Sequence, residues 1–138
     1  MQPVLLQDEI RVPIASDVDI VYARQKGREL ASHLGFSSSE LALIATAISE
    51  LARNIVRYAQ KGAIIIKLVE RGEKHGVHIV ATDNGPGIRN ITLAMQDGYS
   101  TSDGLGLGLP GVRRLMDEFE LVSKNGEGTT VTIKKWLR

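Results

Sequence analysis

The hydrophobic positions of this chain follow two different periods, and their order predicts which segments are helices and which are strands. Apolar residues three to four positions apart are typical of amphipathic helices, and alternating or continuous apolar residues are typical of strands. The helical spacing predicts helices over residues 16–34, 37–61 and 110–119, and a short, weaker one over 91–97. The strand spacing predicts strands over residues 10–14, 63–70, 77–83, 119–124 and 129–136.

The ends of the predicted helices carry local signals. Ser37 and Glu40 have the spacing of a capping box, in which each side chain binds the other residue's backbone N–H. Ser16 and Gly35 are an N-cap and a C-terminal stop for the helix between them. Pro110 is favoured as a first helical residue, because its missing N–H would be unpaired there in any case. These signals support the helix boundaries given above.

The order of the elements predicts the fold class, and the composition limits the kind of protein. Helices clustered near the start, with strands joined mostly by hairpin-type turns, favour an α+β fold arranged as a two-layer α/β sandwich. A chain of 138 residues with 43% hydrophobic and 24% charged residues suits one soluble domain over 1–138. A net charge of +1 gives no general attraction to nucleic acid or membranes. Without cysteines, a signal peptide or a membrane-spanning run, a cytosolic protein is the simplest interpretation.

A glycine-rich stretch, 104–111, is the first candidate binding segment. It matches G-x-G-x-x-G, but no strand directly precedes it, so a dinucleotide-binding turn is disfavoured, and no P-loop motif occurs. Consecutive backbone N–H groups and the start of the helix after it are suited to binding a phosphate. The alternative is a flexible loop that only caps this helix.

A second candidate is the pair Glu50 and Asn54, four residues apart and therefore on one helix face. A carboxylate there can accept a proton from an attacking hydroxyl, and an amide oxygen one turn later can bind Mg²⁺. The alternative is that both are ordinary solvated helix residues. Arg53 beside them is interpreted as a surface cation.

A third candidate is the turn that begins at Asp83, at the end of an apolar strand. An ionised Asp only accepts hydrogen bonds, so it suits an exocyclic amino group such as that of adenine. Gly85 and Gly87 would let a flat base approach the backbone. Ordinary turn chemistry explains the same residues equally well. A fourth segment, from Gly126 to Thr129, has the alternative interpretation of a simple hairpin turn followed by a strand-forming residue.

These four segments, in this order, resemble the N, G1, G2 and G3 boxes of the ATPase/kinase superfamily shared by gyrase, Hsp90, histidine kinases and MutL. The resemblance extends from Ser37 to the last strand and implies the Bergerat (GHKL) fold, a mixed sheet with helices on one face that binds ATP and Mg²⁺. It implies that Glu50 is the general base and Asn54 the Mg²⁺ ligand. It also implies that Asp83, with Gly85, Gly87 and Thr129, holds the adenine. The phosphates would be surrounded by Gly104, Leu105, Gly106, Leu107, Gly108 and Leu109, under a lid formed by residues 88–103.

Within that superfamily, "ISELARNIVRYAQKG", "DNGPGI", "DGYSTSDGLGLGLPGVRRLMDEFEL" and "KKWLR" are similar to the serine/threonine switch kinases of the bacterial stressosome. The resemblance implies phosphorylation of STAS-domain scaffold or antagonist proteins, and activation of a PP2C-type phosphatase by binding. Together with the net charge and the composition, we expect no nucleic-acid or membrane partner and a bacterial cytoplasmic location. Two alternatives stay open: an anti-sigma kinase that binds a sigma factor directly, and a non-enzymatic module gated by nucleotide.

One feature of the lid departs from some relatives. Ser100, Thr101 and Ser102 occupy the place where some relatives carry a lysine, so neutralisation of the phosphates by the lid is in doubt. The positive charge would then come from Mg²⁺ or from Arg113 and Arg114, which are equally interpretable as a solvated helix face.

Overall fold

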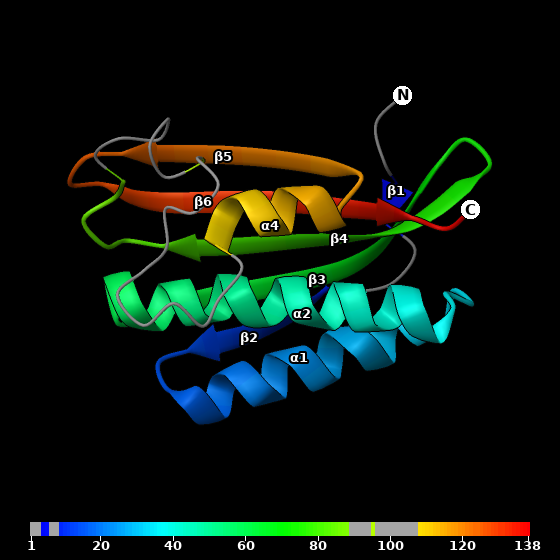
Figure 1. Cartoon of the computed structure of the whole chain (residues 1–138), viewed down its shortest axis with the longest axis horizontal. Coiled ribbons are helices and arrows are strands. Elements are labelled where there is room, and N and C mark those ends of the chain that lie inside the picture. Colours follow the sequence, from blue (N-terminus) through cyan, green and yellow to red (C-terminus); the bar gives the residue numbers. More distant parts are fainter. Residues whose placement is uncertain (1–3, 6–8, 89–94, 96–107) are drawn as a thin grey trace.

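The computed structural model of the chain describes residues 4–5, 9–88, 95 and 108–138. These residues form two layers, with helices covering one face of a sheet (Figure 1). The strands are β1 (Val4–Leu5), β2 (Ile10–Ile14), β3 (Gly62–Arg71), β4 (Lys74–Asp83), β5 (Glu118–Lys124) and β6 (Gly128–Trp136). The helices are α1 (Asp17–Ser32), α2 (Ser38–Asn54) and α4 (Gly108–Leu115), and the π-helix η1 (Ile55–Ala59) continues α2. The predicted α+β two-layer sandwich is confirmed.

The sheet has the strand order β1-β3-β4-β6-β5, and β2 also pairs with β3. Every pairing between the described strands is antiparallel, so the prediction of a mixed sheet is wrong. The reason is the position of β6. It lies between β4 and β5, and these two strands, which run in the same direction, therefore do not pair with each other (Figure 1).

The two long helices begin and end close to the predicted residues. The capping box is confirmed, because the Ser37 hydroxyl accepts from the Glu40 backbone N–H at 3.1 Å and Glu40 Oε1 accepts from the Ser37 N–H at 3.2 Å. Ser16 is at the N-cap of α1, but its hydroxyl donates to Asp19 Oδ2 at 3.3 Å instead of capping the helix. Gly35 has φ +89°, which suits the residue that ends a helix.

The last helix differs from its predicted boundaries. It begins at Gly108 rather than Pro110, because the first backbone N–H groups of a helix have no intrahelical partner and a proline at the third residue removes no bond. It ends at Leu115 rather than near Phe119. The Asp117 N–H binds the Lys134 carbonyl at 3.0 Å, which brings the chain directly onto the edge of β6. Phe119 therefore belongs to β5.

The hydrophobic core fills the space between the helices and the sheet. Its fully buried side chains include Ile14, Ile44, Ile48, Leu51, Ile64, Ile66, Leu68, Ile79, Val112 and Ile133. Each such side chain stabilises the fold by about 1.5–3 kcal/mol relative to an exposed position. Gly27 allows α1 to lie close to α2, since a Cβ atom there would be 2.1 Å from Ile48 Cδ1. The core thus fixes α2, the helix that carries Glu50 and Asn54, against β3 and β4.

The face of the sheet opposite the helices carries charged residues around a histidine. His78 on β4 is directly opposite Lys67 on β3 and Lys134 on β6. Burial, together with the positive charges of these two lysines, lowers the pKa of His78 to about 4. Its Nε2 atom is buried without a hydrogen-bond partner. His78 is therefore neutral in the folded protein near pH 7.

Candidate active site

Glu50 is a buried carboxylate between two helices. It lies on α2, which packs directly against α4, and only 6% of the residue is exposed. Its Oε1 atom accepts from Arg53 Nη1 at 2.5 Å, and its Oε2 atom is 3.4 Å from the Gly108 backbone nitrogen. The structure thus brings Glu50 to the first residue of α4, where the partial positive charge of a helix start favours an anion. Burial excludes the interpretation of Glu50 as an ordinary solvated helix residue.

Asn54 is the last residue of α2 and is half-buried, one turn after Glu50. The five residues that follow it form η1, a π-helix that the sequence did not predict. Single π-helical turns are often found at functional sites. Ile55 packs against Gly62 of β3, where a Cβ atom would be 2.9 Å from Ile55 Cγ2. Because Gly62 pairs with Asp83 in the sheet, Asn54 and Asp83 lie at the same end of the molecule.

Asp83 ends β4 and begins the predicted adenine-binding turn. Its Oδ1 atom accepts from the Gly85 N–H at 2.9 Å, which is the ordinary turn chemistry considered above. A Cβ atom at Gly85 would be 2.6 Å from Ala59 Cβ, and one at Gly87, where φ is +79°, would be 2.2 Å from the Lys124 carbonyl oxygen. Both glycines are therefore required by packing within the chain. Contact with a base stays a prediction for these residues.

Thr129 lies directly opposite Asp83 in the pairing of β4 with β6. Its hydroxyl is 2.9 Å from the Ser123 hydroxyl, and Ser123 Oγ also accepts from the Ile88 N–H at 2.8 Å. The structure thus places Thr129 beside the predicted adenine residue, as the motif order implies. The sequence did not predict that Ser123 binds both Thr129 and the turn after β4. The alternating pattern of β5 does not show which of its hydroxyl groups faces that turn.

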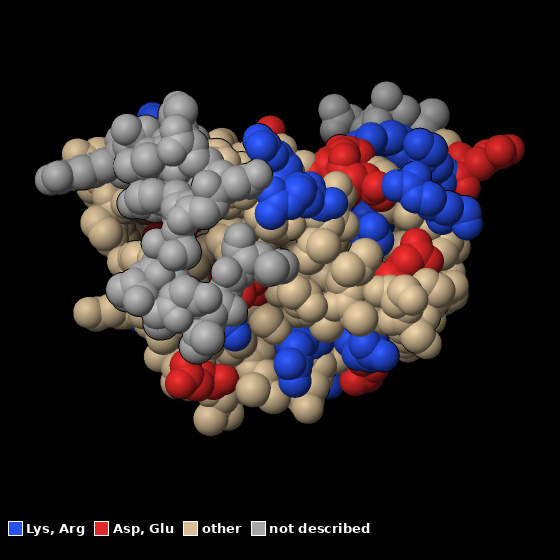
Figure 2. All heavy atoms as spheres, viewed as in Figure 1, with Lys and Arg blue, Asp and Glu red and all other residues tan. Residues whose placement is uncertain are grey.

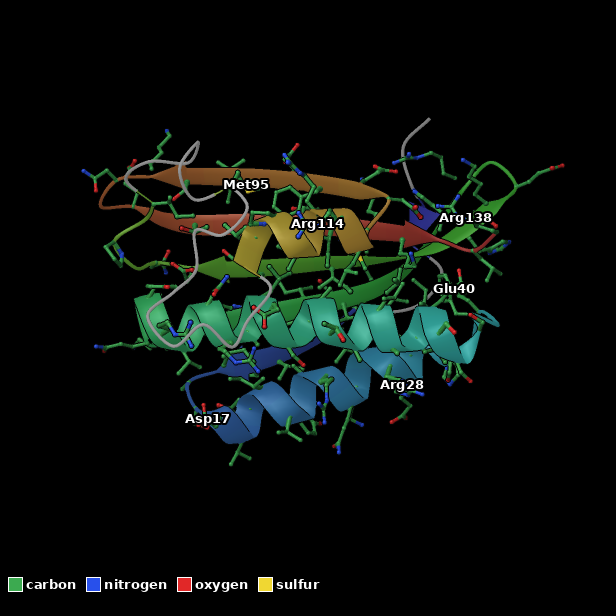
Figure 3. The ribbon with its side chains drawn as sticks, viewed as in Figure 1. Asp17, Arg28, Glu40, Met95, Arg114 and Arg138 are labelled. Atoms are coloured by element: carbon green, nitrogen blue, oxygen red, sulfur yellow. The ribbon has the colours of Figure 1, made fainter. Side chains whose placement is uncertain are left out.

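The predicted phosphate-binding segment is described only in part. Gly108, with φ +69°, and Leu109 form the start of α4, and the Leu109 side chain is in the core. Gly104, Leu105, Gly106 and Leu107 lie outside the described residues. The same holds for most of the predicted lid, including the weak helix predicted over 91–97 except for Met95. Ile88 and Met95, which are described, are partly buried and pack against the core. Figure 3 labels Met95.

Arg113 and Arg114 are exposed and lie in the last turn of α4, at the opposite end of that helix from Gly108. Basic residues at this position interact favourably with the negative end of a helix. Figure 2 shows the basic side chains of this face in separate groups, with acidic side chains beside several of them. The placement of the two arginines favours a solvated helix face over a contact with phosphates at the start of α4.

A surface pocket of about 380 Å³ lies at the other end of the sheet, where Figure 3 labels Arg138. It is lined by Arg71, Lys74, Asp117, Glu118, Trp136, Leu137 and Arg138. Its charges pair with one another: Arg71 Nη1 binds Glu118 at 3.0 Å, and Arg138 binds Asp117. This pocket contains none of the predicted site residues.

Two further features limit what the described residues can do. They contain no group of three or more His, Asp or Glu side chains able to hold a metal ion by themselves. An ion near Asn54 would take most of its ligands from phosphate and water, as Mg²⁺ does in nucleotide sites.

No helix of the described part of the chain has the length and apolar character to cross a membrane.

Comparison with known proteins places this site in a family. The family model described as "Histidine kinase-, DNA gyrase B-, and HSP90-like ATPase" matches residues 40–138. The serine/threonine-protein kinase RsbT of Bacillus subtilis is 56% identical over 133 residues, which are 96% of this chain and 100% of RsbT. The chain belongs to this ATPase family, in its RsbT-like group.

Two further proteins resemble the chain at lower identity. The anti-sigma F factor of Anoxybacillus flavithermus is 32% identical over 123 residues, covering 84% of this chain and 83% of the factor. The crystal structure of the RsbU and RsbW domains of a Mycobacterium tuberculosis protein superimposes with a TM-score of 0.66 at 19% identity. It matches 96% of this chain, which spans 34% of that longer protein, and this likeness shows the fold alone.

Proposed function

We propose that this RsbT-like protein is a serine/threonine protein kinase that transfers the γ-phosphoryl group of ATP to a STAS-domain protein in a bacterial partner switch. The observation that carries the proposal is the 56% identity, over 96% of this chain, to a protein named as a serine/threonine kinase. The buried carboxylate of Glu50 at the start of α4 supports it, since a kinase needs a base beside its phosphate site.

The reaction requires little covalent chemistry from the protein. The hydroxyl oxygen of the substrate Ser or Thr forms a bond to the γ-phosphorus while the bond from that phosphorus to the oxygen shared with the β-phosphate breaks, and ADP leaves. Glu50 accepts the hydroxyl proton. The remaining contribution is positioning and stabilisation of charge. Buried between α2 and α4, Glu50 is held in one place for this task.

The residues around Glu50 suit a nucleotide. The start of α4 offers backbone N–H groups and a partial positive charge to the phosphates. Asp83 Oδ2, the oxygen that does not bind Gly85, is the acceptor that we assign to the adenine amino group, with Thr129 beside it on β6. Asn54 would contribute an amide oxygen to Mg²⁺, which supplies positive charge to the phosphates when bound.

The partners follow from the RsbT-like group. We assign a STAS-domain scaffold or antagonist as substrate and a PP2C-type phosphatase as the protein activated by binding after release, in the bacterial cytoplasm, with no nucleic-acid or membrane partner. A second candidate function, an anti-sigma kinase that binds a sigma factor directly, is favoured by the 32% identity to anti-sigma F factors. The two functions share the nucleotide site and differ in the partner surface.

The test is to mix the protein with Mg²⁺–ATP and a purified STAS-domain partner and to follow the partner by intact mass. We expect the gain of one phosphoryl group, mapped to a Ser or Thr. Absence of transfer while ATP binding is demonstrated in the same sample would contradict the proposal. A parallel pull-down with a sigma factor distinguishes the second candidate, because only an anti-sigma kinase retains it.

A further inference from the structure

Arg53 is paired with the carboxylate that we assign as the general base. Its Nη1 atom is 2.5 Å from Glu50 Oε1, and the two residues are three positions apart on α2. The side chain of Arg53 is 37% exposed, whereas that of Glu50 is 8% exposed. The interpretation of Arg53 as a plain surface cation is therefore wrong, since its guanidinium group reaches inward to a buried acid.

The two oxygens of Glu50 have different surroundings. Oε1 has a short, charge-assisted contact to Arg53, a class of hydrogen bond about twice as strong as a neutral one. Within the described part of the chain, Oε2 is contacted by the Gly108 N–H at 3.4 Å, which is longer than the usual range for an N–H···O bond. These contacts hold Oε1 more tightly than Oε2, so Oε2 is the oxygen better able to accept from a further donor.

The contact with Arg53 also holds the buried Glu50 carboxylate in one orientation. Removing one member of a buried pair leaves a charge that must find other donors or water, at a considerable energetic cost. With Arg53 in place, rotation of the Glu50 carboxylate would break the contact at Oε1. The guanidinium group thus fixes which oxygen faces the start of α4.

We propose that Arg53 is a positioning residue for phosphotransfer, which holds Oε1 of Glu50 so that Oε2 accepts the proton of the substrate hydroxyl. This inference rests on the proposed function. It goes beyond the family motif, in which Glu50 and Asn54 are the residues with an implied role, and it assigns to Arg53 an effect on turnover rather than on ATP binding.

The test measures kcat and KM for ATP with wild-type protein, Arg53→Met and Arg53→Lys, using the STAS-domain partner as substrate. We expect Arg53→Met to lower kcat by about 10- to 100-fold, the range that misplacement of a catalytic group produces. KM for ATP should stay within about twofold, because the nucleotide contacts are unchanged. Arg53→Lys should recover part of the loss, since a lysine retains the charge without the planar fork. Arg28→Met, at an exposed arginine of α1, is the control and should retain wild-type kcat.

A second measurement separates positioning from direct contact with phosphate. In a Glu50→Asp background the carboxylate is one methylene shorter and withdraws from Arg53, so adding Arg53→Met should lower kcat no further. An equal loss in both backgrounds, or a raised KM for ATP at unchanged kcat, would overturn the assignment. Melting temperatures identify any variant that fails to fold. Absence of transfer by the wild-type protein would instead contradict the kinase proposal itself.

Discussion

Gly87 tests whether packing or ligand contact explains the glycines after Asp83. The change is Gly87→Ala, at a residue with φ +79° whose added Cβ would be 2.2 Å from the Lys124 carbonyl oxygen. A non-glycine residue in the left-handed region costs about 1–2 kcal/mol. Alanine also restricts the unfolded chain more than glycine does, and this offsets about 0.4–1 kcal/mol of the loss of stability. Overpacking against backbone, which cannot rotate away, adds about 1–3 kcal/mol. The expected loss of stability is therefore about 2–4 kcal/mol.

The turn between β5 and β6, which follows the Lys124 carbonyl that Gly87 packs against, offers a matched control in Gly126→Ala. Gly126 has nearly the same backbone conformation, φ +83°, but a Cβ atom there would meet nothing within 4 Å. It should lose about 1 kcal/mol or less, because only the conformational cost applies. Urea unfolding of the three proteins measures both values, and titration with ATP measures affinity. Equal stability of the two variants would refute the packing argument. Weakened ATP binding in Gly87→Ala at unchanged stability would assign the glycine to the nucleotide instead.

Three other changes test separate parts of the account. Asp83→Asn should weaken ATP binding by about 5- to 30-fold, or roughly 1–2 kcal/mol, because an amide can present donors to the adenine amino group; equal affinity by calorimetry would remove Asp83 from that role. Stability should fall as the pH decreases from 6.5 toward 4, because the unfolded chain binds a proton there that folded His78 does not, and His78→Gln should show less of this fall in urea unfolding at each pH. Gly27→Ala should destabilise the protein by up to about 2 kcal/mol, because the clash with Ile48 costs about 1–3 kcal/mol and the higher helix propensity of alanine offsets about 1 kcal/mol; a higher melting temperature would contradict this.

The sequence predicted the elements whose signals are local. The capping box of Ser37 and Glu40, the stop at Gly35 and the strand patterns depend on neighbouring residues, and the structure confirms them. The two-residue strand β1 was missed, because so short a segment has no period of its own. The π-helical turn after Asn54 was missed because its apolar spacing is that of an α-helix.

The candidate site, too, was predicted from the sequence only in part. Motif order identified Glu50, Asp83 and Thr129, and the structure places Glu50 against α4 and Asp83 opposite Thr129. The pairing of Glu50 with Arg53 has a sequence signal, the three-residue spacing of opposite charges on a helix. That spacing occurs on many solvated helices, so only the burial of Glu50 shows that the pair belongs to the site.

The most direct test of the central claim is to compare phosphotransfer and ATP affinity in wild-type protein and in Glu50→Ala, with the STAS-domain partner as substrate. Removing the base should abolish most transfer, by at least about 100-fold, while the affinity for Mg²⁺–ATP changes little. That separation of binding from chemistry is what the account predicts. Unchanged transfer by Glu50→Ala would contradict it, because a protein kinase of this mechanism cannot lose its general base without losing rate.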